Sequence, residues 1–222
     1  MKKFCMAVLI FTALALFAGC VSANPGVRSV RGRGNMETHT IRATGFTGLH
    51  ISGGYELVVG QADSFSVNMY IQSNLFEFVE AEVRDGVLYI SSTRNFNTGA
   101  RNTPRLYVNA PDLNSIFVQG AVDADIVLDV ATLEIDVAGA ANVILAGGRA
   151  ETLSISIAGA ANVEAFNFTA THATVNVAGA GNADIYATDT LNVSIAGVGS
   201  VRYDGGAEVT RSVAGLGTVR RR

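Results

Sequence analysis

The sequence predicts an all-β domain built as a single-stranded parallel β-helix with coils of 18–20 residues. A glycine-led motif recurs six times in the second half of the chain, a regularity that composition alone does not produce. Apolar and polar residues alternate before each of these glycines, as they do in half-buried strands. The leading glycines, at intervals of 19, 20, 20, 18 and 18 residues, are Gly120, Gly139, Gly159, Gly179, Gly197 and Gly215.

The alternating segments define the expected strands. Residues 133–137, 153–157 and 191–195 put aliphatic side chains on one side and polar side chains on the other. Each repeat is therefore expected to contain a strand, a tight glycine turn, a second strand and a return segment. A single coil cannot bury its own apolar side, so neighbouring coils must cover it. Because every copy runs in the same direction, parallel pairing with right-handed winding is favoured, and an antiparallel sandwich is the alternative.

A column of short polar residues follows the glycines, three positions after each one. Asparagine tolerates left-handed turn conformations, and its amide group can hydrogen-bond along a stack. We therefore expect these residues to form a structural ladder at the turn, and binding of a cation or sugar by the column is the alternative. The column consists of Asp123, Asn142, Asn162, Asn182, Ser200 and Thr218.

The last copy replaces apolar residues by arginines. Arg211 occupies the position of Ile135 and Ile155 in earlier copies, and residues 220–222 are all arginine. Polar residues on a terminal strand keep its exposed edge from pairing with another chain. We expect this copy to be a solvated cap rather than a basic binding patch.

The first half of the domain is rich in β-strand signals but less regular. We expect residues 39–118 to continue the stack as irregular coils, with the six regular coils in residues 119–222. Asp85 and Gly86 form a dipeptide that is typical of a β-hairpin turn. The strand candidates are residues 49–51, 56–59, 65–69 and 87–90, and the expected exposed loop is residues 94–104.

The N-terminus predicts export. Residues 1–19 contain two lysines followed by an apolar run, as signal peptides do. The sequence Phe-Ala-Gly-Cys resembles the lipobox of bacterial lipoproteins, so we expect Cys20 to carry a lipid anchor to a membrane. Ordinary cleavage after Ala23 is the alternative. Residues 20–38 are expected to be a flexible linker rich in glycine and arginine, and residues 39–222 the folded domain.

Charge and cysteine content narrow the class of protein. Both lysines and Cys5 lie in the signal segment, so 14 of the 16 basic residues remain against 19 acidic ones, a net charge of −5. This weak acidic balance gives no reason to expect nucleic acid as a partner. With Cys20 lipidated or removed, no disulfide is expected, and stability must come from burial and hydrogen bonding.

The turn motifs resemble a known family. The segments AGAANV, AGAGNA, AGVGSV and AGLGTV, together with FTGLHISGGYELVVGQADSFSV and RDGVLYIS, are similar to the head GIN domain family of auto-transporter adhesins. The similarity covers roughly residues 40–222. It implies a β-helix, an envelope location and an adhesin role. The family prefers serine beside the first glycine, where this chain has alanine at positions such as Ala138, Ala158 and Ala178.

Two non-enzymatic functions follow from this organisation. In the first, the protein is an adhesin-like module whose long polar side meets a glycan or a protein surface, although the sequence shows no aromatic platform beside that side. In the second, it is a structural spacer or assembly partner of the envelope that binds no ligand. The polar side is expected to present Ser154, Ser156, Thr174, Asn176, Asn192 and Ser194.

An enzyme acting on polysaccharides is a remote alternative, because some β-helices have that activity. Such enzymes need clustered acids or bases. Asp123, Asp125 and Asp129 are close in sequence but are expected to be solvated, and His39, His50 and His172 lack metal-ligand spacing. We therefore predict no catalytic residues, no metal and no cofactor.

Overall fold

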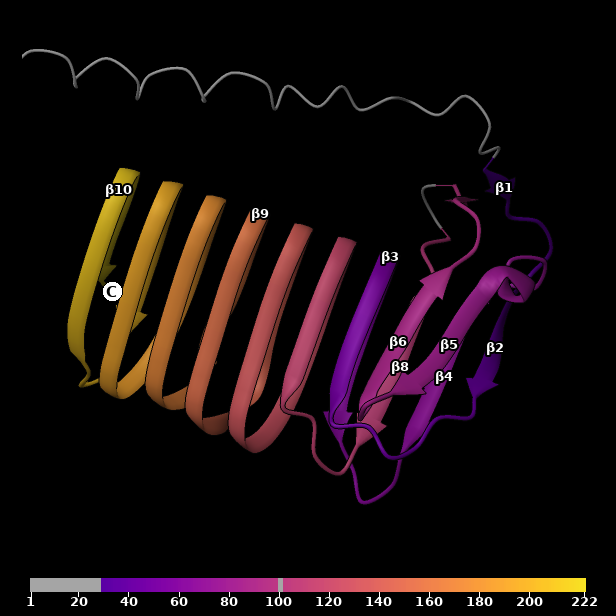
Figure 1. Ribbon diagram of the computed structural model, residues 1–222, viewed down its shortest axis with the longest axis horizontal. Coiled ribbons are helices and arrows are strands. Elements are labelled where there is room, and N and C mark those ends of the chain that lie inside the picture. The colour runs from indigo at the N-terminus through magenta and orange to yellow at the C-terminus, as the bar shows by residue number, and fades with distance from the viewer. Residues whose placement is uncertain (1–28, 100–101) are drawn as a thin grey trace, which may run out of the picture.

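The computed structural model describes residues 29–99 and 102–222, and it is an all-β structure (Figure 1), which confirms the predicted class. The predicted signal peptide, Cys20 and the first part of the predicted linker lie outside the described residues. The elements are β1 (Val30–Arg31), β2 (Met36–Ile41), β3 (Gly48–Gln61), β4 (Ser66–Gln72), the 3-10 turn η1 (Phe76–Phe78), β5 (Val79–Arg84), β6 (Val87–Ser92), β7 (Phe96–Asn97), β8 (Arg105–Ala110), β9 (Ser115–Asp204) and β10 (Glu208–Arg221).

Parallel pairing organises the repetitive part of the chain. Strand β10 pairs with the end of β9 in parallel, from Glu208 opposite Thr190 to Arg221 opposite Tyr203. This offset equals the interval between the last two glycine motifs. Strand β3 pairs in parallel with the start of β9. Figure 1 shows β9 itself as successive windings that lie side by side along the long axis.

The turn glycines lie directly beside one another in successive windings. A Cβ atom on Gly139 would lie 2.2 Å from the carbonyl oxygen of Gly120, and one on Gly159 would lie 2.2 Å from that of Gly139. No side chain fits at such a distance from a neighbouring backbone. The column begins one winding earlier than the sequence motif suggested, because Gly53 in β3 lies opposite Gly120.

The core lies inside the windings and consists of the aliphatic side chains of the alternating segments. Fully burying one such side chain contributes about 1.5–3 kcal/mol. Arg211 of β10 lies opposite Val193 but is exposed, and its guanidinium group donates a hydrogen bond to the carbonyl oxygen of Val219. One buried column consists of Ile135, Ile155, Val175 and Val193.

Residues 39–118 do not continue the parallel stack throughout, which corrects the expectation of irregular coils. Strands β2 and β4, β4 and β8, and β5 and β6 pair in antiparallel fashion. The predicted hairpin is confirmed: Asp85 and Gly86 have φ angles of 50° and 76° and reverse the chain between β5 and β6. Strand β3 extends through both regions, pairing in parallel with β6, β8 and β9.

Candidate binding surfaces

The predicted polar column forms an amide ladder, which we define as Asp123, Asn142, Asn162 and Asn182. The Nδ2 atom of Asn142 donates a hydrogen bond to Oδ1 of Asp123 over 2.8 Å. Asn162 donates to Asn142 over 3.2 Å, and Asn182 donates to Asn162 over 3.0 Å. An amide group has two N–H donors, so each asparagine keeps one for solvent or a ligand. Farther along, the Thr218 hydroxyl donates to Oγ of Ser200 over 3.2 Å.

Glu56 occupies the same column one winding before the ladder. It lies opposite Asp123 on one side and opposite Arg105 on the other, and it forms an ion pair with Arg105. The hydrogen bond and charge of the Glu56 carboxylate raise the pKa of Arg105. Glu56 follows Gly53 at the spacing that separates Asp123 from Gly120, and this spacing is the sequence signal that could have identified it.

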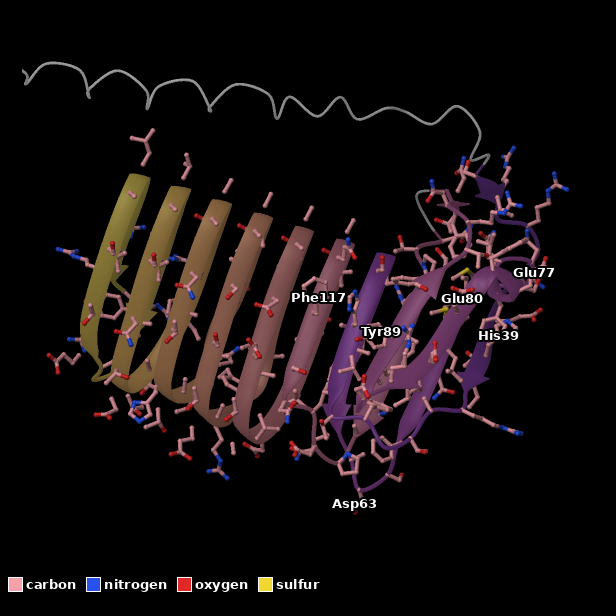
Figure 2. All side chains as sticks on the ribbon, in the orientation of Figure 1. His39, Asp63, Glu77, Glu80, Tyr89 and Phe117 are labelled. Carbon is pink, nitrogen blue, oxygen red and sulfur yellow. The ribbon has the colours of Figure 1, made fainter. Side chains whose placement is uncertain are left out.

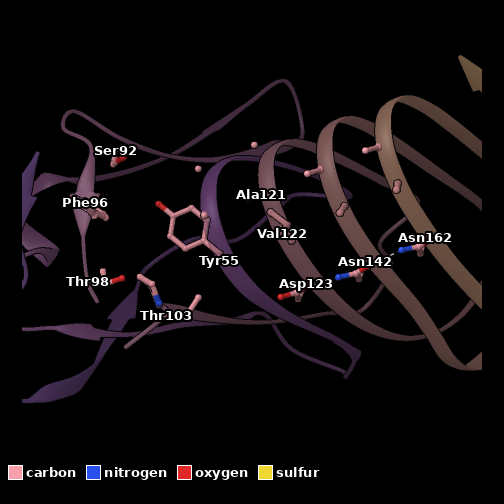
Figure 3. Close-up of a pocket in the computed structure, with 18 of the residues that line it drawn as sticks. Tyr55, Ser92, Phe96, Thr98, Thr103, Ala121, Val122, Asp123, Asn142 and Asn162 are labelled. Carbon is pink, nitrogen blue, oxygen red and sulfur yellow. Dashed lines mark hydrogen bonds between the residues drawn. The ribbon is translucent and has the colours of Figure 1, made fainter. Parts of the chain in front are cut away.

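An open groove of about 980 Å³ runs along the ladder (Figure 3). Its floor is made of small residues at the positions that follow the turn glycines. The next residues in this column are Val198 and Leu216, whose side chains are 56% and 80% exposed and end the groove. The small residues of the floor include Ala121, Ala140, Ala160 and Ala180.

A buried tyrosine lies at the other end of the alanine floor, and the groove continues past it to Ser92 and Phe96. Tyr55 is 2% exposed, and its hydroxyl has no hydrogen-bond partner in the described part of the chain. Figure 3 shows this hydroxyl pointing away from the windings, toward Ser92 and Phe96. Burial raises the pKa of Tyr55 to about 12, an effect that the nearby Ser92 hydroxyl opposes without forming a bond of normal geometry. The phenol is therefore a neutral donor at physiological pH, and leaving it unpaired costs about 1–3 kcal/mol.

A row of aromatic rings lies on the outer surface. The ring of His50 lies 4.5 Å from that of Phe117 and 5.0 Å from that of Tyr89, centroid to centroid. The Arg84 guanidinium lies 4.9 Å from the Tyr89 centroid. The rings of His50, Tyr89 and Phe117 are all half-buried. The expectation that no aromatic platform accompanies the polar side is therefore wrong, because strands β3, β6 and β9 bring together rings that are distant in sequence.

The aromatic row adjoins the polar side that the sequence predicted. Phe117 borders a shallow depression of about 240 Å³ over the windings of β9. Figure 2 labels Phe117 and Tyr89 at the junction of these windings with the N-terminal strands. We call the aromatic row together with this depression the aromatic–polar face. The depression also includes Asp136, Ser156 and Asn176, with alanines at 138, 158 and 178.

The remaining acidic and histidine candidates are dispersed. Asp129 forms an ion pair with Arg149 at 3.3 Å. His172 contacts the Thr190 hydroxyl at 2.9 Å. The ring of His39 stacks on Phe76, with their centroids 4.0 Å apart. In residues 29–99 and 102–222, no three His, Cys, Asp or Glu side chains are grouped in a way that could hold a metal ion.

The fold and its surfaces define a repetitive all-β protein. The comparison with protein families identifies the family to which it belongs. Residues 45–207 match the model of the family described as "Putative auto-transporter adhesin, head GIN domain". The chain belongs to this family. Among curated proteins, none matches the chain. In the part of the chain that the structure describes, no helical segment has the length and hydropathy of a membrane span.

Solved structures share this fold. A "putative adhesin" from Bacteroides fragilis NCTC 9343 is 20% identical, with a TM-score of 0.68 over 87% of this chain and 100% of that one. A "putative lipid binding protein" from Parabacteroides distasonis ATCC 8503 is 22% identical, with a TM-score of 0.54 over 88% and 100%. A "putative adhesin" from the same organism is 20% identical, with a TM-score of 0.53 over 88% and 100%. At these identities the likeness concerns the fold alone.

Proposed function

We propose that this protein is a non-enzymatic, adhesin-like module of the bacterial cell envelope that binds a glycan or protein surface through its aromatic–polar face. The observation that carries the proposal is the aromatic row of Tyr89, His50 and Phe117, which is half-buried instead of packed in the core. Aromatic rings with an apolar body and a polar surrounding are enriched at binding surfaces. The family description supports the adhesin role.

The rigid scaffold favours binding by this face. The rings and the neighbouring polar groups come from strands paired in one sheet, so their relative positions are fixed before a partner arrives. A preorganised surface loses less conformational entropy on binding. Isolated polar groups on a solvated sheet would bind weakly, and the rings add the apolar contact area that such groups lack.

We propose that β3, β9 and β10 form a single-stranded parallel β-helix of right-handed sense. The parallel registers, the adjacent turn glycines and the amide ladder support this assignment. A helix of this kind presents one residue type per winding along each outer column. It would therefore hold a long, regular side against a surface.

The proposed location is the cell envelope, with a lipid on Cys20 as the anchor. The predicted signal peptide and lipobox support this location, as does the family description. Mass spectrometry of the mature N-terminus tests the anchor. A diacylated or triacylated Cys20 is expected, and an unmodified N-terminus at Asn24 would refute the anchor.

The binding face is tested by attachment of cells that display the tagged protein, after protease treatment of intact cells has established surface exposure. Replacing Phe117 and His50 together by alanine is expected to lower attachment about tenfold or more, because aromatic anchors dominate binding energies. Leu216→Ala removes an exposed apolar side chain from the opposite end of the stack and serves as the matched control. Equal attachment by all three proteins would overturn the proposal and favour the spacer role.

A further inference from the structure

The groove beside the amide ladder is a surface distinct from the aromatic–polar face. We propose that it binds a neutral, linear oligosaccharide, with about one sugar unit per winding and one chain end beside Tyr55. This inference goes beyond the proposed function, because none of the groove residues belongs to the aromatic row.

The repeat of the floor matches such a ligand. Ala121, Ala140, Ala160 and Ala180 present the same small side chain in four successive windings. Neighbouring strands lie ~4.8 Å apart, which is close to the length of one pyranose unit in an extended chain. A sugar chain that runs along the groove would therefore meet an equivalent set of contacts at each unit.

The walls have the mixed chemistry that sugars need. Each ladder asparagine keeps one N–H donor that the ladder does not use, and Asp123 adds carboxylate lone pairs that can accept from hydroxyl groups. The alanine methyl groups offer apolar contact to the C–H faces of pyranose rings. Binding sites generally combine an apolar lining with a few placed polar groups in this way.

The charge of the groove selects against anions. Asp123 is negatively charged, and none of the described residues that line the groove is Lys or Arg. The neighbouring carboxylate of Glu56 is already paired with Arg105 outside the groove. An acidic polysaccharide would therefore meet repulsion without a compensating cation, whereas a neutral chain would not.

The two ends of the groove define the length of the ligand. At one end, the groove continues past the Tyr55 ring to Ser92 and Phe96, and the buried, unpartnered hydroxyl of Tyr55 points toward these two lining residues, where a chain end that passes the ring would meet it. It can donate to an oxygen of the terminal sugar. At the other end, the exposed side chain of Val198 stands where the next alanine would be. About four sugar units fit between these ends.

The experiment is calorimetric titration of the purified full-length protein with neutral β-1,4-linked oligomers of glucose, mannose and N-acetylglucosamine, one to six units long. Affinity for the best series is expected to rise with length up to about four units and then to level off. Oligogalacturonate of matched length is expected not to bind. Tighter binding of the acidic series, or affinity that keeps rising to six units, would overturn the proposal.

Two variants shift the expected plateau in opposite directions. Val198→Ala removes the block and is expected to move the plateau to about five units. Ala160→Val places a valine in the middle of the groove and is expected to limit the plateau to about two sugar units. Ala131→Val, an exposed substitution outside both the groove and the aromatic–polar face, is the matched control and is expected to leave the plateau at four. An Ala160→Val protein that retains the original plateau would overturn the assignment.

Tyr55→Phe separates the chain-end contact from the rest of the groove. Loss of one hydrogen bond is expected to lower affinity about tenfold at every length without moving the plateau. Unchanged affinity would show that the hydroxyl serves the fold alone and would overturn the placement of the chain end. If the Phe117 and His50 double variant loses oligomer binding and the groove variants retain it, the groove proposal fails while the aromatic–polar face stands.

Discussion

The two regions of this molecule solve the same packing problem in different ways. In residues 115–222, successive copies pair in parallel, and each winding covers the apolar side of the one before it. In residues 29–114, antiparallel pairs and a hairpin surround a single strand, β3, that belongs to both regions. Repetition therefore organises one region, and individual turns organise the other.

The functional features gather where these regions meet. The ring of His50 in β3 packs at a tilt against that of Phe117 in β9, and Tyr55 of β3 lines the groove that the windings of β9 form. The repetitive region supplies equivalent polar and small residues in each winding. The irregular region supplies aromatic residues that occur once, so a repetitive surface acquires defined ends.

The largest expected effect tests whether close approach of windings limits the repetitive region. Gly139→Ala would place a Cβ atom 2.2 Å from the Gly120 carbonyl oxygen, and we expect the free energy of unfolding to fall by about 3 kcal/mol or more. Chemical denaturation measures this loss. Gly147→Ala is the matched control, because its Cβ would lie 3.9 Å from the nearest atom. Equal losses in the two variants would contradict the explanation.

The sequence predicted the repetitive region better than the irregular one for a physical reason. A fixed interval makes equivalent residues neighbours, so the positions of Asn142 and Asn162 follow from counting. No interval relates His50 to Phe117 or Gly53 to Gly120, because the β5–β6 hairpin and three further strands intervene. The polar side and the ladder could therefore be predicted, and Glu56 could have been found from its spacing to Gly53, whereas the aromatic row and the Tyr55 end of the groove could not.

The second prediction concerns the junction of the two regions and its response to pH. Burial raises the pKa of Tyr55 to about 12 from the usual 10.0. Above pH 10 the unfolded chain releases this proton more readily than the folded one, so the stabilisation is complete below pH 10 and is lost as pH rises toward 12. The loss amounts to at most about 2–3 kcal/mol. In denaturation curves between pH 8 and 12, Tyr55→Phe should decline less steeply than the parent, and parallel declines would count against this assignment.

The third prediction isolates backbone strain in the irregular region. Gly86 has a φ of 76°, but a Cβ atom there would meet nothing within 4 Å. Gly86→Ala is therefore expected to cost about 1 kcal/mol, from the left-handed conformation alone. This is less than the loss at Gly139, where a steric clash is added. The same denaturation experiment measures both, and a larger loss at Gly86 would show that the hairpin, not the stack, limits stability.

The smallest expected effect decides whether the amide ladder is a scaffold or a binding element. Asn162→Ala removes the hydrogen bonds to Asn142 and Asn182. Because both hydrogen bonds are exposed to solvent, the free energy of unfolding should fall by only about 1 kcal/mol. Ser200→Ala, beyond the end of the groove, removes the single hydrogen bond from the Thr218 hydroxyl and should cost less. A loss of several kcal/mol at Asn162 would make the ladder essential to the stack. A small loss of stability combined with a large loss of oligosaccharide affinity would instead mean that the amides serve the groove. Water replaces an exposed hydrogen-bond partner at little cost, whereas a bound ligand would have no substitute for the missing donor.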